Sequence, residues 1–315
     1  MFKSFKYHPP TVRAEDPNNH RLGQKIRQVE SLAALEKAAK PGDTVLIGYP
    51  DDRGVQRNHG RIGACEGPDG FRKVFFNYSS MILDGKKRQL FDLGDHDSWS
   101  HQLLESQEAA RGTIQSLRKL GLRCISIGGG HDWAYSDFID FPGTIINLDA
   151  HFDVRPTPED SLSQGHSGNA FRRLQLAEAR GQSQLIVVGA QKCSNSAEHH
   201  SWLSKHRGAV FFYDDLSLDI EKQWNEIRNF IDLHHKSERL ALSIDLDVFS
   251  QAYAPGVSAP VATGMNPAVA REVIRHYGPR IEHLGIYELN PRLDRDYATS
   301  RLAAHLALSY LDQTL

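Results

Sequence analysis

Residues 144–153 read Thr-Ile-Ile-Asn-Leu-Asp-Ala-His-Phe-Asp, an apolar run that ends in two carboxylates and an imidazole. Asp149, His151 and Asp153 stand two positions apart, so in an extended strand their side chains share one face. Carboxylates are costly to bury without a counter-charge. A divalent cation resolves that conflict, so this stretch predicts a metal site at the end of a strand.

Two further apolar runs end in groups of the same kind. Asp245 and Asp247 close the run 240–244, and His131 follows residues 125–127 and three glycines. An isolated aspartate in such a place is often a helix cap, but three such runs in one chain favour a common site. Together they predict a binuclear metal centre. Its ligands would be His131, Asp149, His151, Asp153, Asp245 and Asp247.

Short apolar runs alternate with amphipathic stretches along the chain, which predicts a mostly parallel sheet covered by helices on both faces. In such sheets ligands bind outside the carboxyl ends of the strands, where all three clusters lie. The expected strands are Thr44–Tyr49, Gln89–Leu93, Arg123–Ile127, Thr144–Leu148, Leu185–Val188, Ala209–Tyr213, Leu240–Ile244 and Glu282–Tyr287. The expected helices are Gln102–Leu120, Gly168–Ala179, Leu218–His234, Pro267–Tyr277 and about Asp296 to Leu311.

The remaining sequence features favour one globular domain. No internal repeat or low-complexity linker divides residues 1–315, and residues 1–40 are expected to form an N-terminal extension. A net charge of -2 gives no reason to expect a nucleic acid or a membrane as partner. No apolar run reaches the ~18–20 residues of a membrane span, and the N-terminus lacks a signal peptide. We therefore expect a cytoplasmic protein, with Cys124 as a small core residue.

The ligand set constrains the metal and the reaction. Four carboxylates with two imidazoles form a hard, oxygen-rich set that favours Mn²⁺ or a similar ion over thiolate-bound zinc. Four negative charges balance two divalent ions. Two neighbouring ions lower the pKa of a shared water and make it a nucleophile near neutral pH. The expected reaction is hydrolysis.

Four motifs resemble those of the ureohydrolase superfamily of arginases, agmatinases and formimidoylglutamases, from about residue 54 to the C-terminus. They are Gly129-Gly130-His131, Asp149-Ala150-His151-Phe152-Asp153, Asp245-Leu246-Asp247 and Glu288-Leu289-Asn290-Pro291. The resemblance implies a three-layer α/β/α sandwich around an eight-stranded, mostly parallel sheet, with two Mn²⁺ per chain. It also implies that Asp149 and Asp245 bridge both ions, and that the chain forms trimers or hexamers. His131 and Asp153 would complete one metal site, and His151 and Asp247 the other.

The same resemblance assigns roles beyond the metals. Glu288 would face the cationic amidine or guanidine of the substrate, and Asp153 would pass a proton to the departing amine. His166 matches the family's mobile proton-shuttling histidine, although it can also be a plain loop residue. Asp95-His96-Asp97 has ligand-like residues but no metal in the family pattern, so we expect a capped turn. The pairs His199-His200 and His234-His235 are expected to be solvated.

Within the superfamily, formimidoylglutamases fit best, on the stretches 54–68, 128–132 and 254–260. Arg155 lies two positions after a predicted ligand, where a guanidinium suits a substrate carboxylate. Further candidate substrate-binding residues, some of which can instead be turn residues, are Arg61, Asn58, Asn169 and Asn195. Two departures near the expected substrate cleft leave the substrate open: Asp132 replaces an expected Glu, and Asn169-Ala170 replaces an expected Thr-Pro.

The predicted function is therefore hydrolysis of an acidic amidine, N-formimidoyl-L-glutamate, to L-glutamate and formamide, as in histidine degradation. One alternative is another ureohydrolase that releases urea from agmatine, arginine or a guanidino acid. A more remote alternative is an inactive homologue that senses a ligand. The presence of all six metal positions and His166 weighs against that last possibility.

Overall fold

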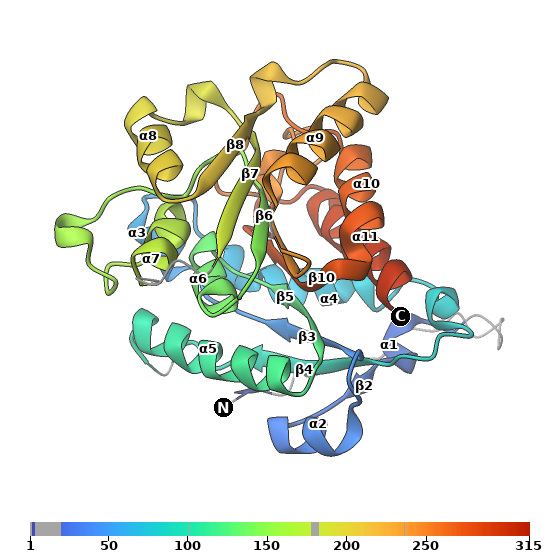
Figure 1. The fold of residues 1–315 in the computed structure, drawn as a ribbon. Coiled ribbons are helices and arrows are strands. Elements are labelled where there is room, and N and C mark those ends of the chain that lie inside the picture. Colours follow the sequence, from blue (N-terminus) through green and yellow to red (C-terminus); the bar gives the residue numbers. More distant parts are fainter. Residues whose placement is uncertain (1, 4–19, 100, 178–182, 236) are drawn as a thin grey trace.

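A computed structural model describes residues 2–3, 20–99, 101–177, 183–235 and 237–315. Its strands form one ten-stranded sheet in the order β1-β4-β3-β5-β10-β9-β6-β7-β8, with β2 paired to β4 beside this path. Helices cover both faces of the sheet (Figure 1). The predicted α/β/α architecture with a mostly parallel sheet is confirmed. Among the described residues, no helix is long and apolar enough to cross a membrane.

All eight predicted strands are present, and all pair in parallel with one another. Their bounds are β3 Thr44–Gly48, β4 Leu90–His96, β5 Arg123–Ile127, β6 Thr144–Leu148, β7 Gln184–Ala190, β8 Gly208–Phe212, β9 Leu240–Asp245 and β10 Ile281–Tyr287. The sheet also contains β1 (Phe2–Lys3), antiparallel to β4, and β2 (Arg27–Gln28). These two-residue strands lie in the segment expected to be an extension and are too short to show a periodic pattern.

The five predicted helices are also present, within a few residues of the expected bounds. The predicted end of one of them at Ala179 lies outside the described residues. They are α5 Leu103–Lys119, α7 Ala170–Ala177, α9 Ile220–His234, α10 Pro267–Tyr277 and α11 Ala298–Thr314. Further helices that the sequence analysis did not predict are α1 Leu22–Lys25, α2 Leu32–Ala38, α3 Arg53–Arg57, α4 Gly67–Phe75, α6 Ala134–Phe138 and α8 Ala197–Lys205.

The two faces of the sheet pack into two separate apolar cores. In β3, Val45 and Ile47 belong to the core beneath α5 and α6, whereas Leu46 belongs to the core beneath α10 and α11. The alternation follows the two-residue period of a strand. Because both faces are buried, the strands read as continuous apolar runs, and this made them recognisable in the sequence.

The run Asp95-His96-Asp97 differs from its predicted capped turn, because it begins as the end of β4. Arg72 of α4 is fully buried and donates to Asp92 Oδ2 and Oδ1 at 3.0 and 2.9 Å, and it also pairs with Asp95. His96 is 3% exposed, with Nε2 3.0 Å from the carbonyl of Ser106. The run therefore ties the strand to α4 and α5, and the turn prediction is wrong.

Candidate metal centre

Four neighbouring strands bring the predicted ligands together. In the sheet β5, β10, β9 and β6 lie side by side, and a polar residue stands at or just beyond the carboxyl end of each. His131 follows β5 after three glycines, Glu288 follows β10, Asp245 ends β9, and Asp149 follows β6. The parallel arrangement places residues more than a hundred positions apart at one edge of the sheet.

The ligand atoms of the six predicted residues form two adjoining groups. His131 Nδ1 lies 2.8 Å from Asp153 Oδ2 and 3.1 Å from both Asp149 Oδ2 and Asp245 Oδ2. His151 Nδ1 lies 3.0 Å from Asp247 Oδ2 and 3.7 Å from Asp149 Oδ1. Asp149 thus belongs to both groups, whereas Asp245 lies in the group with His131. In each group the ligand atoms lie within 4.8 Å of one another.

The charges of this cluster fit a pair of cations. The buried Nδ1 of His131 can offer one proton at most to the three carboxylates around it. Burial and the neighbouring charges of Asp247 and Asp149 hold the pKa of Asp245 well above its usual range. Burial raises the pKa of Asp247 to about 6. The four carboxylates outnumber the two imidazoles, and hard divalent cations suit this set of oxygen and nitrogen donors.

Two residues that the sequence analysis did not identify fix the imidazole of His131. Its Nε2 lies 2.9 Å from Ser243 Oγ of β9, so Nδ1 is left facing the carboxylates. The ring of Tyr287 stacks against it, with centroids 4.9 Å apart and planes 27° apart. Ser243 precedes Asp245 by two positions on the same strand, so both side chains lie on the same face, and this spacing could have identified Ser243 in the sequence.

Two residues of the site adopt left-handed backbone conformations that side chains rarely take. The φ angles are +50° at Asp153 and +66° at Glu288. Such conformations persist where the surrounding structure holds them, and they concentrate at functional sites. At Glu288 the backbone N–H donates to the carbonyl of Gly129 at 2.9 Å. The strand therefore ends there, and the carboxylate turns toward the metal ligands.

The Glu288 carboxylate is buried and held by a donor on each oxygen. The backbone N–H of His131 donates to Oε1 at 2.9 Å, and Ser258 Oγ donates to Oε2 at 2.7 Å. Burial, together with the charge of Asp245, raises the pKa of Glu288 to about 8. A bound cation beside this carboxylate would stabilise its ionised form.

A small cavity of 60 Å³ lies over the cluster and adjoins a larger one of 420 Å³. His151, Asp153 and Arg155 line both, so the two cavities meet at the ligand cluster. The small cavity is also lined by Glu288 and Ser258.

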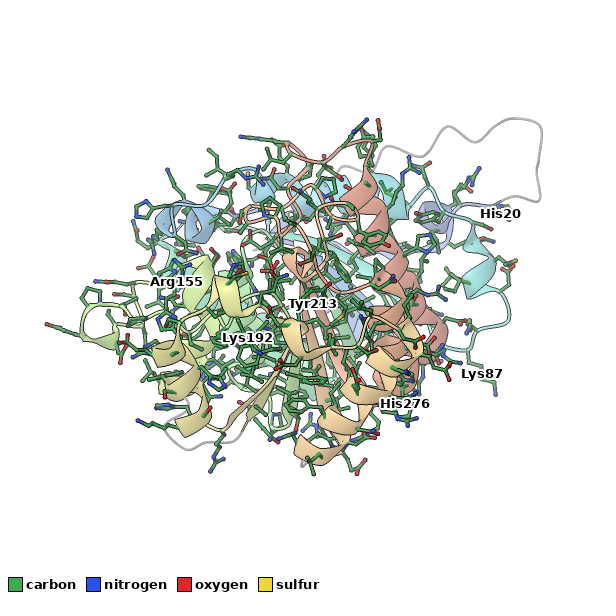
Figure 2. All side chains as sticks on the ribbon, turned by 90° about the horizontal axis from the view of Figure 1, so that it is seen from above. His20, Lys87, Arg155, Lys192, Tyr213 and His276 are labelled. Carbon is green, nitrogen blue, oxygen red and sulfur yellow. The ribbon has the colours of Figure 1, made fainter. Side chains whose placement is uncertain are left out.

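The predicted substrate-binding residues fall into two sets. Arg155 (labelled in Figure 2) and Asn58 line the small cavity, and Arg155 Nη1 donates to Asn58 Oδ1 at 3.3 Å. The amides of Asn169 and Asn195 are already bonded within the loops. Asn169 Oδ1 accepts from the backbone N–H of His166, and Asn195 Oδ1 accepts from that of Phe152, both at 2.9 Å. These two amides shape the loops around the ligands.

Asn195 lines the 420 Å³ cavity, whereas Arg61 lines neither cavity. The Nε of Arg61 donates to the carbonyl of Ser258 at 3.0 Å, and its Nη2 donates to that of Val257 at 2.6 Å. Asp132 is fully buried and accepts from Gln107 Nε2 at 2.8 Å. It does not line the cleft, so its departure from the expected Glu affects packing behind His131.

The predicted proton-shuttling residue lies on the loop that enters α7. The backbone N–H of Gly168 donates to His166 Nδ1 at 3.2 Å, so Nε2 carries the proton of the neutral ring. Burial and the positive charges of Arg155 and Arg173 lower the pKa of His166 to about 4. The imidazole is therefore neutral near pH 7 and able to accept a proton.

The four histidines expected to be solvated are half-buried, so that prediction is wrong. His199 lines the 420 Å³ cavity, and His200 packs against Phe152 and Phe212. His234 packs on Phe230, and His235 lies edge-on to Tyr277. The ring partners of His200 and His235 come from other elements, so the local sequence did not show them, whereas Phe230 precedes His234 by four positions in α9.

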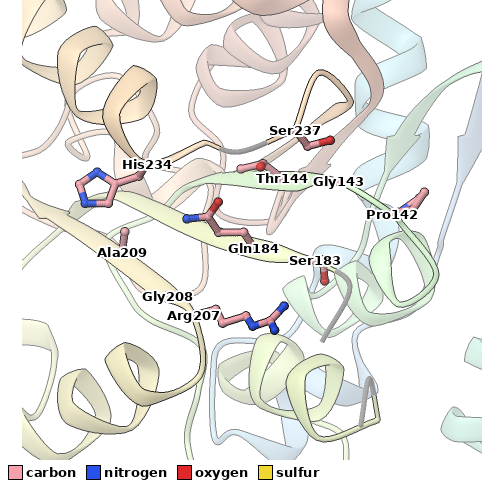
Figure 3. Close-up of a pocket in the computed structure, with 10 residues that line it drawn as sticks. All are labelled: Pro142, Gly143, Thr144, Ser183, Gln184, Arg207, Gly208, Ala209, His234 and Ser237. Carbon is pink, nitrogen blue, oxygen red and sulfur yellow. The ribbon is translucent and has the colours of Figure 1, made fainter. Parts of the chain in front are cut away.

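A further cavity of 680 Å³ lies at the opposite end of the sheet (Figure 3). Thr144, Gln184 and Gly208 line it, and each is the first residue of its strand, in β6, β7 and β8. Parallel sheets bind ligands at the carboxyl ends of their strands. Size alone therefore does not identify the reactive site, which is the smaller cavity over the ligand cluster.

The sequence model of the arginase family matches residues 42–312. The chain belongs to the arginase family. The predicted resemblance is confirmed. The matched residues include β3 to β10, and so all four strands at whose ends the ligand cluster lies.

Relatives within the family share most of their length with this chain. A formimidoylglutamase from Streptococcus gordonii is 32% identical over 303 residues, which cover 90% of this chain and 89% of the relative. A crystal structure of Trypanosoma cruzi formiminoglutamase with Mn²⁺ superposes with a TM-score of 0.77 at 26% identity, over 93% of this chain and 98% of that one. Formimidoylglutamase from Bacillus subtilis has the same fold, with a TM-score of 0.80 at 24% identity over 98% and 96% of the two chains.

Proposed function

We propose that the protein hydrolyses N-formimidoyl-L-glutamate to L-glutamate and formamide. One observation carries this proposal. A carboxylate, Glu288, and a guanidinium, Arg155, line the same small cavity beside the ligand cluster. A cationic amidine suits the carboxylate, and an anionic glutamate moiety suits the guanidinium. The formimidoylglutamase relatives support the same substrate.

The six clustered ligands would hold two Mn²⁺ ions. His131, Asp149, Asp153 and Asp245 offer one group of donors, and Asp149, His151 and Asp247 offer the other. The bound ions would lower the pKa of a water shared between them and so supply a nucleophile near neutral pH. The Trypanosoma cruzi relative crystallised with Mn²⁺ supports this choice of metal.

The protein's side chains would bind and orient the substrate. Glu288 would hold the amidinium group, with its two oxygens fixed by the donors already described. Arg155 would bind a carboxylate of the glutamate moiety at the boundary of the 420 Å³ cavity, with Asn58 steadying the guanidinium. We leave Asn169, Asn195 and Arg61 out of the substrate site, because their polar atoms already bond to loop backbone.

Hydrolysis breaks the bond between the formimidoyl carbon and the glutamate nitrogen. That nitrogen must gain a proton as it leaves, and Asp153 would deliver it from its carboxyl oxygen. The water oxygen ends on the formimidoyl carbon, which departs as formamide. His166, neutral near pH 7, would exchange protons between the site and solvent through its ring nitrogens.

A substrate panel on the Mn²⁺-loaded protein tests the proposal. We expect formamide and glutamate from N-formimidoyl-L-glutamate, with little urea from agmatine, arginine or guanidino acids. Agmatine would place a bare ammonium beside Arg155, which opposes binding. Urea release with no formamide would show a different ureohydrolase activity. Loaded protein inactive on the whole panel would point to the ligand-sensing alternative.

A further inference from the structure

Three chain segments meet around the Glu288 carboxylate, and a closed ring of hydrogen bonds joins them. We propose that Arg61 is a positioning residue that holds Ser258 against Glu288 and so sets the direction of the carboxylate that faces the substrate. The identity of that substrate rests on the proposed function. The hydrogen-bonded ring itself is independent of it.

Arg61 donates two hydrogen bonds to the loop that carries Ser258. Its Nε and Nη2 donate to two consecutive carbonyls, of Ser258 at 3.0 Å and of Val257 at 2.6 Å. A guanidinium presents its donors in a rigid plane, so contacts to consecutive carbonyls fix both the position and the tilt of a loop. Residues 257–258 therefore cannot shift without breaking two charge-assisted hydrogen bonds.

Ser258 in turn fixes one oxygen of Glu288. Its hydroxyl donates to Oε2 at 2.7 Å, while the backbone of His131 donates to Oε1 from the other side. Each carboxylate oxygen keeps a further lone pair for the cavity. Without Ser258 in place, only the bond to Oε1 would remain, and the carboxylate plane would turn about it.

Asn290 closes the ring. Its Nδ2 donates to the carbonyls of Arg61 and Ile62, both at 3.1 Å, and its backbone N–H donates to that of Gly256 at 2.7 Å. The turn that carries Arg61 also needs a glycine next to Asn290. Gly63 has φ +133°, and a Cβ there would lie 2.3 Å from Asn290 Oδ1. These contacts hold the turn at residues 61–63 in the position from which Arg61 reaches the loop at residues 257–258.

A neighbouring arginine provides a matched control. Arg292 lies two positions beyond Asn290, but its guanidinium pairs with Glu66, 2.7 Å away, rather than with the 257–258 carbonyls. Both arginines are exposed over part of their length and both come from loops at the same edge of the sheet. Only Arg61 connects to Glu288 through Ser258.

The experiment is a double-mutant cycle with Arg61→Ala, Ser258→Ala and the double variant, beside Arg292→Ala and Ser258→Thr. We expect Arg61→Ala and Ser258→Ala each to lower kcat/KM about 10-fold, mostly through kcat, because a misdirected carboxylate presents the substrate carbon poorly. The double variant should be no worse than Ser258→Ala, since Arg61 acts through that hydroxyl. Ser258→Thr keeps the hydroxyl and should restore most of the rate, and Arg292→Ala should match the wild type.

Crystal structures of the wild type and of Arg61→Ala give a second readout that needs no substrate. In the variant we expect the Ser258 hydroxyl to move beyond hydrogen-bonding distance of Glu288. Losses that multiply in the double variant, or an unchanged Ser258–Glu288 bond in the crystal, would overturn the proposal. Wild-type protein that consumes a guanidino compound instead of N-formimidoyl-L-glutamate would refute the proposed function, and the cycle would then be measured on that compound.

Discussion

Arg155 lies where the two cavities meet, and it carries the proposed preference for an acidic substrate. Arg155→Ala should lower kcat/KM for N-formimidoyl-L-glutamate about 10–150-fold, chiefly through KM, because a charge-assisted pair to a substrate carboxylate is lost. Steady-state kinetics with metal analysis measures this. Arg155→Lys is the control, since it keeps the charge but not the planar fork. An unchanged KM in Arg155→Ala would place the substrate carboxylates elsewhere.

A substitution at His166 tests its proposed role in proton exchange. His166→Asn keeps a polar side chain on the loop but removes the titrating ring, so turnover should fall by about 10²-fold or more with two ions still bound. The measurement is kcat across a range of pH, with elemental analysis of the same samples. Turnover equal to the wild type at every pH would reduce His166 to a loop residue.

The clustering of the six candidate metal ligands was predictable at this scale, and the contacts of the candidate substrate-binding residues were not. The ligands follow from a two-residue spacing at the ends of apolar strands, which fixes the face on which each side chain lies. Asn169, Asn195 and Arg61 lie on irregular loops, where the direction of an amide or guanidinium depends on contacts distant in sequence. Their carbonyl and N–H partners became evident only in the folded chain.

At the scale of elements, the junction of β4 and α5 makes stability depend on pH. Burial lowers the pKa of His96 to about 4, against about 6.5 in an unfolded chain. The unfolded chain therefore takes up the proton first. The stability contributed by neutral His96 is complete above about pH 6.5 and is lost as the pH falls toward 4.

Between pH 7.5 and pH 5 this loss amounts to about 2 kcal/mol of unfolding free energy. Urea unfolding at the two pH values measures it, with His96→Gln as the reference, because Gln can donate to the Ser106 carbonyl and does not titrate. The variant should lose about 2 kcal/mol less than the wild type over that range. Equal losses in both proteins would assign the pH dependence to other groups.

The length and burial of the helices and strands explain which of them could be predicted from the sequence. The eight long strands read as continuous apolar runs and the five predicted helices as amphipathic stretches, so both kinds of element could be recognised in the sequence. The strands β1 and β2 contain two residues each, and helices such as α3 and α6 contain five. Segments that short show less than two full repeats, too few to establish a period, and tertiary contacts decide their conformation.

For the whole molecule, the metals should contribute to stability as well as to catalysis. Without cations the clustered carboxylates repel one another, so adding a chelator should lower the Tm, and Mn²⁺ should restore it. Calorimetry measures this, and elemental analysis should find two ions per chain. In Asp245→Ala the activity should vanish and the chelator effect should shrink. Fully active protein with one ion per chain would rule out the binuclear centre.

The place of β10 in the sheet has a consequence for biosynthesis. It is the last strand in the chain, yet it lies between β5 and β9 and joins the two halves of the sheet. A nascent chain that has reached residue 280 therefore carries two unpaired strand edges, which are prone to aggregate. The partners on β5 and β10 lie about 159 residues apart, as in His283 and Cys124, so closure is slow as well as late. Assembly of the ligand group that joins His131 to Asp149, Asp153 and Asp245 must wait for that step, because β10 brings β5 beside β9.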